Sequence, residues 1–410
     1  MSGTELATPA TGTGAALAQR AVEWLKKRGA ESAVVVEKRR SVSVETRERR
    51  VETLKDANSA SLSVAIYVEG KYGGHVTSDL AWPALEKFLG DAVAMTRALE
   101  PDRFRSLPDP RWYAGRSSAD LGLADATYEA FSAAERKGIA LAVEEAALSG
   151  EAGGIQSVSA WFGDERREMC RVTSNGFTGL EEATAFWTGA SVTMRDGDRR
   201  PEDYWNVATR RRAELGDPAA IGREAARRAR MRVGAKKVAG GAMTVLVENQ
   251  TAGRLLHHLL AAASAPALQQ KRSFLEGKVG AKVASEALTM LDDPLVAGGL
   301  GSRAFDGEGI AAKRFPLVEA GVLRNFYVDW YYGRKLGMDP TTGGTSNLVV
   351  APGKRSLAEI EKSIDRGLLV TSFLGGNSNS LTGDFSVGVQ GVLVEKGART
   401  QPVVEMNLAG

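Results

Sequence analysis

The chain has 410 residues, and its 53 lysines and arginines nearly balance its 50 aspartates and glutamates, which gives a formal net charge of +3. A charge this small does not indicate nucleic-acid binding, and no apolar run approaches the roughly 20 residues that a membrane-spanning helix needs. Hydrophobic residues make up 43% of the chain, so we expect a globular protein of two or three domains.

The first predicted domain covers residues 14–110, after a disordered lead-in at residues 1–13 that is rich in alanine, threonine and glycine. The lead-in lacks the basic and apolar segments of a secretory signal, which favours the cytoplasm. Helical and alternating patterns then predict an α+β unit of the helix–strand–strand–helix kind. Its expected elements are a helix from about residue 13 to Gly29, strands at 33–37, 42–44 and 62–68, a turn at 70–74 and a helix at 80–99.

The second predicted domain, residues 115–235, has the pattern of an antiparallel sheet between two helices. We expect a helix at 127–148, extended segments at 156–162, 168–174 and 182–194, and a helix at 218–233. The last helix is basic, but no aromatic residues are interleaved with its arginines and Glu224 lies among them, so we interpret it as a solvated face and not as a nucleic-acid surface. The arginines concerned are Arg223, Arg227, Arg228, Arg230 and Arg232.

The third predicted domain, residues 240–410, is rich in glycine and in short strands, which predicts a mainly-β domain with a few helices. A buried strand is expected at 243–247, and Thr251 can cap a helix that runs to about residue 263. Ser356 and Glu359 form a capping box for a later helix, which Gly367 can end. The fold class predicted for the whole chain is therefore α+β.

The sequence contains few recognisable catalytic motifs. It lacks His-Glu-x-x-His, Cys-x-x-Cys and Gly-x-Ser-x-Gly motifs. The only cysteine, Cys170, is expected to be a buried structural thiol in a reducing compartment. His257 and His258 are neighbours on a predicted helix, where they point about 100° apart and cannot readily share one metal ion. His75 is expected to be solvated in a turn.

The C-terminal third contains a series of short motifs in a specific order and spacing. They include Gly-Gly-Asn-Ser-Asn at 375–379 and Thr-Gly-Asp-Phe at 382–385. With these motifs the chain resembles the TldD/PmbA family, once described as modulators of DNA gyrase, and the first domain agrees with that family. The other matching stretches lie at 271–280, 283–289, 292–294, 298–302, 305–309, 321–323 and 392–397.

The resemblance also indicates which of two chain types this is. TldD-like chains carry His-Glu-x-x-x-His after the first strand of the C-terminal domain; the histidines and a later cysteine bind zinc, and the glutamate activates water. Here the matching stretch has Ala252 for the first histidine, Gly253 for the glutamate and His257 for the second histidine, and no cysteine follows Cys170. One imidazole does not hold zinc tightly, and no carboxylate is left to act as a base. The resemblance therefore implies a TldE/PmbA-type chain with no catalytic residue, no metal and no cofactor of its own.

The resemblance further implies a partner role. A TldD-like subunit would hold the zinc and cleave small or unfolded peptides in a closed chamber, while this chain completes the wall as a heterodimer partner. A homodimer is possible when the partner is absent, and neither nucleic acid nor a membrane is expected to bind. Chamber-lining loops and tight turns that only shape the sheet are equally compatible with the glycine-rich motifs. The candidate residues for the peptide channel are Gly375, Gly376, Asn377, Ser378, Asn379, Thr382, Gly383 and Asp384.

Two other functions stay open. An active peptidase or hydrolase with an unrecognised site would need carboxylates, although these candidates are also expected in turns: Asp292, Asp293, Asp306 and Glu308. A DNA gyrase-linked regulator would agree with the family's older description but not with the small net charge.

We expect the C-terminal domain to bury a large surface against a second family member. An aromatic cluster could contribute to that interface or belong to the core: Phe326, Tyr327, Trp330, Tyr331 and Tyr332.

Overall fold

The computed structural model describes residues 13–149 and 153–410. The lead-in predicted at 1–13 lies outside the described residues, apart from Thr13, which begins the first helix. Within the described residues, no helix is both long enough and apolar enough to cross a membrane. The helices are α1 (Thr13–Lys26), α2 (Trp82–Arg97), α3 (Ala133–Leu148), α4 (Pro218–Arg230), α5 (Asn249–Ala262), α6 (Ala265–Gln269), α7 (Trp330–Leu336) and α8 (Leu357–Lys362).

Strands differ greatly in length along the chain. Those before residue 210 have up to 19 residues, whereas those after it have from 2 to 13. The strands are β1 (Glu31–Arg47), β2 (Arg50–Val68), β3 (Lys71–Thr77), β4 (Ile155–Thr173), β5 (Thr178–Met194), β6 (Glu202–Thr209), β7 (Thr244–Val247), β8 (Met290–Asp292), β9 (Phe315–Glu319), β10 (Val322–Leu323), β11 (Leu348–Val350), β12 (Arg366–Ser378), β13 (Phe385–Glu395) and β14 (Ala398–Ala409).

A single antiparallel sheet, in the order β3-β2-β1-β4-β5-β6, joins the first and second predicted domains. β1 pairs with β2 along one edge and with β4 along the other. The separate strands predicted at 33–37 and 42–44 are wrong, because both lie in β1. The segments predicted at 156–162 and 168–174 likewise belong to the single strand β4, which ends at Thr173. The turn predicted at 70–74 is also too long, since β3 already begins at Lys71.

Charged residues in the middle of β1 and β4 explain why the sequence pattern predicted interruptions there. The partners of these charges lie on neighbouring strands. Arg40 on β1 donates to Asp56 on β2 over 2.9 and 3.2 Å. Arg39 lies 3.1 Å from Glu165 on β4. Opposite charges across neighbouring strands stabilise the pairing, so the strands continue through segments that look too polar in isolation.

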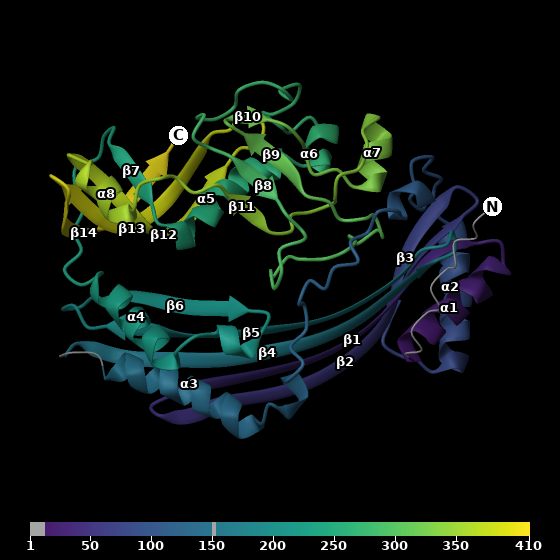
Figure 1. Cartoon of the computed structure of the whole chain (residues 1–410), viewed down its shortest axis with the longest axis horizontal. Helices are drawn as coiled ribbons and strands as arrows, with labels where there is room; N and C mark the ends of the chain where they lie inside the picture. The colour runs from purple at the N-terminus through teal and green to yellow at the C-terminus, as the bar shows by residue number, and fades with distance from the viewer. Residues whose placement is uncertain (1–12, 150–152) are drawn as a thin grey trace.

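Helices α1 to α4 cover one face of this sheet, as Figure 1 shows. Toward one end, α1 and α2 pack on a core that includes Val36 and Ile66. Toward the other end, α3 and α4 pack on Ala160 and Val192. Between them, Val44 lies opposite Phe162 in the strand register, and both are fully buried under α3.

The C-terminal segment forms two small sheets, ordered β10-β9-β8-β11 and β14-β13-β12-β7. β7 runs parallel to β12, and the other pairs in both sheets are antiparallel. The predicted α+β fold class, with a mainly-β C-terminal segment, is confirmed. The capping box of Ser356 and Glu359 is present at the start of α8. Gly367 does not end that helix, which stops at Lys362; it lies in β12 instead.

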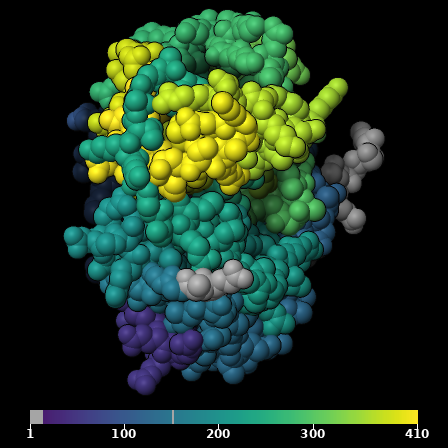
Figure 2. Space-filling view, turned by 90° about the vertical axis from the view of Figure 1, so that its left-hand side faces the viewer, coloured from purple at the N-terminus to yellow at the C-terminus, as the bar shows by residue number. Residues whose placement is uncertain are grey.

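The C-terminal segment lies across the long sheet from α1, α2 and α3 (Figure 1), and the space-filling view of Figure 2 shows it packed against the central segment. The amide of Gly298 donates to the carbonyl of Leu121 over 2.7 Å. Phe177, in the turn between β4 and β5, meets Phe305 edge-on with ring centroids 5.1 Å apart. Polar and aromatic contacts therefore both hold the two regions together.

The aromatic cluster makes contacts inside the chain. Phe326 and Tyr327 are buried in the core of the C-terminal segment. Trp330 donates to the hydroxyl of Ser106 over 3.0 Å, and Tyr331 donates to Asp102 over 2.7 Å. The cluster thus supplies both core and a contact with the connector that follows α2.

Candidate functional site

The segment that resembles the zinc motif lies on α5, directly after β7. Glu248 is the N-cap of this helix, so the predicted cap at Thr251 is wrong by one turn. Gly253 and His257 are exposed, and Ala252 is partly buried. Their side chains offer one methyl group, one hydrogen atom and one imidazole, so only His257 could act as a metal ligand.

This arrangement does not fit a zinc ion. Structural and catalytic zinc sites use at least three protein ligands, and within residues 13–149 and 153–410 no group of three or more histidine, cysteine, aspartate or glutamate residues could hold a metal ion. The remaining cysteine and histidine are remote in the fold, since Cys170 lies in β4 and His75 in β3. The expectation of a solvated turn for His75 is wrong, because its ring lies 3.1 Å from the hydroxyl of Thr96 on α2.

The side chain of His258, at the next position of α5, is partly buried and packs on an aromatic ring. Its ring stacks on Phe385 with centroids 6.0 Å apart and planes at 14°. Burial, together with the nearby charges of His257 and Arg254, lowers the pKa of His258. Phe385 is the last residue of the Thr-Gly-Asp-Phe motif and the first residue of β13, so α5 contacts that motif.

The two glycine-rich motifs form the exposed hairpin between β12 and β13. The amide of Asn379 donates to the backbone carbonyl of Asp384 over 2.7 Å, and the hydroxyl of Thr382 donates to the Asp384 carboxylate over 2.7 Å. Gly376 has a φ of +153°, and a Cβ there would lie 2.5 Å from the carbonyl oxygen of Ser386, so only glycine fits. The hairpin is therefore a tight turn at the surface. That it also lines a peptide channel remains a prediction.

A buried polar cluster joins the start of α5 to the central segment. Arg228 on α4 is 4% exposed; it donates to Glu248 over 2.8 Å and to the carbonyl of Thr371 on β12 over 3.1 Å. Arg232 donates to Asp203 on β6 over 2.9 Å. We call Asp203, Arg228, Arg232 and Glu248 the junction cluster.

The junction cluster corrects the interpretation of the basic helix as a solvated face. Arg228 and Arg232 are buried, whereas Arg223 and Arg227 are exposed and pair with Asp217 and Glu224. Their spacing of four residues was the available signal, because it places Arg228 and Arg232 on one side of a helix. The sequence did not show Asp203 and Glu248 as their partners, since these lie in other elements.

A small pocket opens beside the junction cluster. Its volume is about 90 Å³, and its walls come from β6, α4, the first turn of α5 and β12. Gln250 and Thr251 line it from α5, and the next residue is Ala252. The pocket therefore adjoins the start of the segment that resembles the zinc motif.

The carboxylates proposed for an alternative hydrolase site are held by neighbouring groups. Asp292 is fully buried in β8, where it accepts from Tyr327 over 3.0 Å. Asp306 accepts from the amide of Ile310 over 3.0 Å, and Glu308 from the amide of Trp330 over 2.7 Å. Burial raises the pKa of Asp306 and raises that of Glu308 to about 7. Asp292 lies in a strand and not in the predicted turn.

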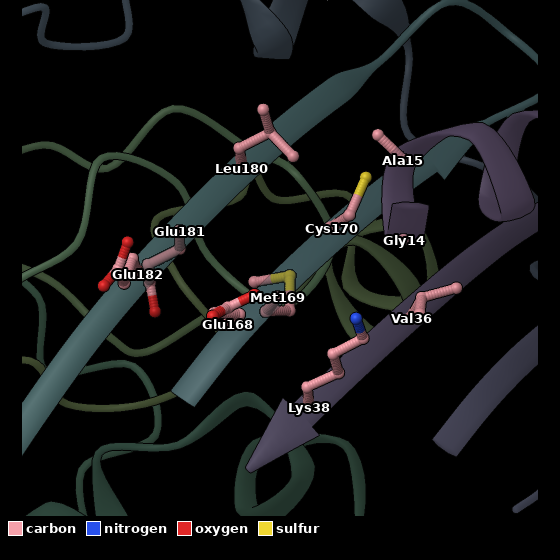
Figure 3. A pocket seen from close by; sticks show the side chains of 10 residues that line it. All are labelled: Gly14, Ala15, Val36, Lys38, Glu168, Met169, Cys170, Leu180, Glu181 and Glu182. Atoms are coloured by element: carbon pink, nitrogen blue, oxygen red, sulfur yellow. The ribbon is translucent and has the colours of Figure 1, made fainter. Parts of the chain in front are cut away.

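Cys170 lines a different pocket of about 300 Å³ between β1, β4, β5 and the start of α1. Figure 3 shows its sulfur directed toward Ala15, with Lys38 and Glu168 farther along the strands. The side chain is 4% exposed, and burial raises the pKa of the thiol. A protonated, buried thiol is a poor nucleophile, in agreement with the expected structural role.

Three protein-family models match the chain. They describe domain 1 of the PmbA/TldA metallopeptidases at residues 33–96, the central domain at 127–233 and the C-terminal domain at 240–410. The third match covers both small sheets, α5 and the exposed hairpin. The C-terminal match therefore includes the segment that resembles the zinc motif.

Individual relatives cover nearly the whole chain. A metalloprotease PmbA homolog from Haemophilus influenzae is 30% identical over 394 residues, which is 95% of this chain and 86% of the relative. A Bacteroides thetaiotaomicron protein described as a modulator of DNA gyrase is 37% identical, with a TM-score of 0.93 over 96% of this chain and 90% of that chain. TldE from Thermococcus kodakarensis has the same fold, with a TM-score of 0.82 and 21% identity over 96% and 90% of the two chains.

Proposed function

Because this chain belongs to the PmbA/TldD metallopeptidase family, we propose that it is the metal-free partner subunit of a TldD-like peptidase. The partner subunit supplies the zinc and the base. This chain forms part of the wall of a chamber in which small or unfolded peptides are cleaved, and it stabilises the fold of its partner. The assembly acts in the cytoplasm.

One observation carries the proposal. The first turns of α5 present Ala252, Gly253 and His257 where a TldD-like chain has two zinc ligands and a catalytic glutamate. In the described part of the chain, no group of three or more histidine, cysteine, aspartate or glutamate side chains is placed to replace them, and the neighbouring His258 packs on Phe385. Of these three groups only the imidazole of His257 is left, and loss of the first histidine together with the glutamate weakens metal binding and removes the base that activates water.

The surface around α5 suits a supporting role. The β12–β13 hairpin is exposed and closed by its own hydrogen bonds, so it can meet a second subunit without refolding. β7 and β14 are the two edge strands of their sheet. The backbone of Lys236 already pairs with β14 beside Val403; where an edge has no such partner, it can bind an extended chain through backbone hydrogen bonds. The same edges favour a heterodimer, or a homodimer when the partner is absent.

A reconstitution experiment tests the proposal. The purified chain is assayed on an unfolded peptide alone and after mixing with a His-Glu-x-x-x-His relative from the same genome. We expect no cleavage by the chain alone, higher activity in the mixture, and a stable complex in size-exclusion chromatography with light scattering. His257→Ala in this chain should leave the stimulation unchanged.

The alternatives predict different results. Chelator-sensitive cleavage by this chain alone, with about one zinc per chain that is lost in His257→Ala, would show an active peptidase. A monomer that is unchanged by the relative would refute the partner role. A sequence-dependent DNA complex at physiological salt would favour the gyrase-linked regulator.

A further inference from the structure

The loop between Phe305 and Ala311, which we call the bridging loop, joins the C-terminal segment to the long sheet. Phe305 and Ala311 pair as an isolated bridge, and the Ala311 amide donates to the carbonyl of Trp112 in the connector after α2 over 2.9 Å. On the sheet, Arg171 of β4 lies opposite Gly179 of β5 in the strand register. A Cβ at Gly179 would lie 2.6 Å from the Phe305 ring, so the bridging loop rests on the sheet beside Arg171.

Two carboxyl groups of the bridging loop are removed from solvent. Asp306 is 6% exposed, and Glu308 is partly buried. One oxygen of Asp306 accepts from the amides of Glu308 and Ile310 over 2.9 and 3.0 Å, while its Oδ2 is buried and has no donor among the described residues. Glu308 accepts from the amide of Trp330 at the start of α7 over 2.7 Å. Neutral amides therefore hold both groups, and in the described part of the chain neither group forms an ion pair.

The charges around Asp306 and Glu308 do not balance. The ionised groups whose charges act on the pKa of one or both are an aspartate and two arginines: Asp329 at the N-cap of α7, Arg171 on β4 and Arg303 just before the loop. Burial raises the pKa of two nearby tyrosines, which therefore stay neutral: Tyr67 on β2 and Tyr113 in the connector. Three carboxyl groups thus face two guanidinium groups. The cluster is neutral only when one carboxyl group holds a proton, and a buried net charge is costly.

Closure of the bridging loop and protonation of the pair favour each other. Burial raises the pKa of Asp306, and it raises the pKa of Glu308 to about 7. The ordinary glutamate value of 4.5 applies once the loop leaves the sheet and the carboxyl groups meet water. The closed loop therefore binds the proton more tightly than the open loop. Closure is most favourable below about pH 4.5 and weakens as the pH rises through 7.

We propose that the bridging loop is a pH-sensitive latch: a proton held by Asp306 and Glu308 keeps it closed on β4 and on the connector, and loss of that proton near neutral pH opens it. Opening breaks the bond from Ala311 to Trp112, which links the C-terminal segment to the first half of the chain. The hold of the C-terminal segment on the long sheet therefore responds to pH. The inference concerns contacts within one chain and does not depend on the proposed function.

Amide hydrogen exchange of the full chain at pH 6 and pH 8 tests the latch. The amide of Ala311 reports on opening, because its acceptor on Trp112 lies outside the loop. With a pKa of 4.5 in the open loop and about 7 in the closed loop, its protection factor should be about tenfold lower at pH 8 than at pH 6. Each protection factor is taken relative to the exchange rate of an unstructured chain at the same pH. At pH 8, urea up to about 1 M should leave it unchanged, because local opening exposes little surface.

Two isosteric substitutions remove the titration. Asp306→Asn and Glu308→Gln each keep an oxygen that can accept from the same backbone amides, so both variants should fold normally. Each alone should reduce the tenfold ratio between pH 6 and pH 8, and the double variant should bring it to about one, because no proton is left to lose. Glu319→Gln is the matched control: Glu319 is exposed and pairs with Arg324 over 3.0 Å, so the tenfold ratio should remain.

Three results would overturn the proposal. The first is a protection factor of Ala311 that is the same at pH 6 and pH 8 in the wild type. The second is a tenfold ratio that survives in the double variant. The third is a urea dependence as steep as that of amides in the middle of β2, because exchange would then require global unfolding. Stimulation of a His-Glu-x-x-x-His relative is a separate measurement, and its failure would leave the latch intact.

Discussion

The long sheet and the C-terminal segment bury carboxylates in different ways. Under the sheet, Asp164 is fully buried and pairs with Arg136, which is 3% exposed, over 2.5 and 3.2 Å. In the C-terminal segment, Asp292 and Glu308 accept from hydroxyl and amide groups, and among the described residues neither forms an ion pair. The buried carboxylate of the sheet is therefore stabilised by an opposite charge, whereas those of the C-terminal segment are stabilised by neutral hydrogen-bond donors. For Glu308, whose pKa burial raises, that stabilisation also varies with pH.

The largest effect is expected from breaking the matched pair. Asp164→Ala leaves Arg136 buried without a counter-charge, and we expect the free energy of unfolding to fall by about 3–5 kcal/mol in denaturant titration. Asp56→Ala is the control, since Asp56 pairs with Arg40 but its side chain is 40% exposed, and its loss should cost under about 1 kcal/mol. Similar losses in the two variants would mean that burial does not distinguish these pairs.

The next effect concerns pH in the C-terminal segment. Burial raises the pKa of Glu308 from 4.5 to about 7, with Asp306 and Asp329 adding to the effect and Arg171 opposing it. The folded state holds this proton more tightly than the unfolded state, so the associated stability is complete below about pH 4.5 and is lost as the pH rises through 7. Glu308→Gln should therefore unfold like the wild type at pH 4 and be more stable at pH 8, by up to about 3 kcal/mol.

Thermal unfolding at the two pH values measures this difference. Glu286→Gln provides the control, because Glu286 is exposed and pairs with Lys282. It should show no such change with pH. A Glu308→Gln variant that is destabilised at pH 8 would contradict the idea that this carboxyl is unmatched when ionised.

A smaller effect is expected from removing one neutral donor. Tyr327→Phe deletes the hydroxyl that donates to Asp292, leaving the fully buried carboxylate with the two donors of Ser346. Loss of a hydrogen bond to a charged acceptor should cost about 1.5–3 kcal/mol. Tyr113→Phe removes an equally long 3.0 Å bond to neutral Asn175 and should cost less. Equal costs in denaturant titration would show that the charge on Asp292 is unimportant.

The same contrast explains how far the sequence predicted this fold. The helix near residue 13, the capping box at Ser356 and the family resemblance came from local patterns or ordered motifs, and the structure or the family comparison confirms them. The continuity of β1 was missed, because the partners of its charged residues lie on β2 and β4. For the candidate site, local sequence located α5, but Asp203 and Arg228 reach it only through tertiary packing.

The smallest effect is expected on α4, where two neighbouring arginines have opposite surroundings. Arg227 is half exposed and donates to Glu224 over 2.7 Å, three positions earlier on the helix. Arg228 points about 100° away around the helix, and its guanidinium is buried in the junction cluster. Arg227→Gln removes a solvent-screened pair and should lower the free energy of unfolding by under about 1 kcal/mol. This loss of unfolding free energy should shrink further at 1 M salt, because screening weakens exposed pairs.

Arg228→Gln, measured in parallel, should lower the free energy of unfolding several times more, and that loss should depend little on salt. If the two variants behave alike, Arg228 is not the buried link between the two halves of the chain.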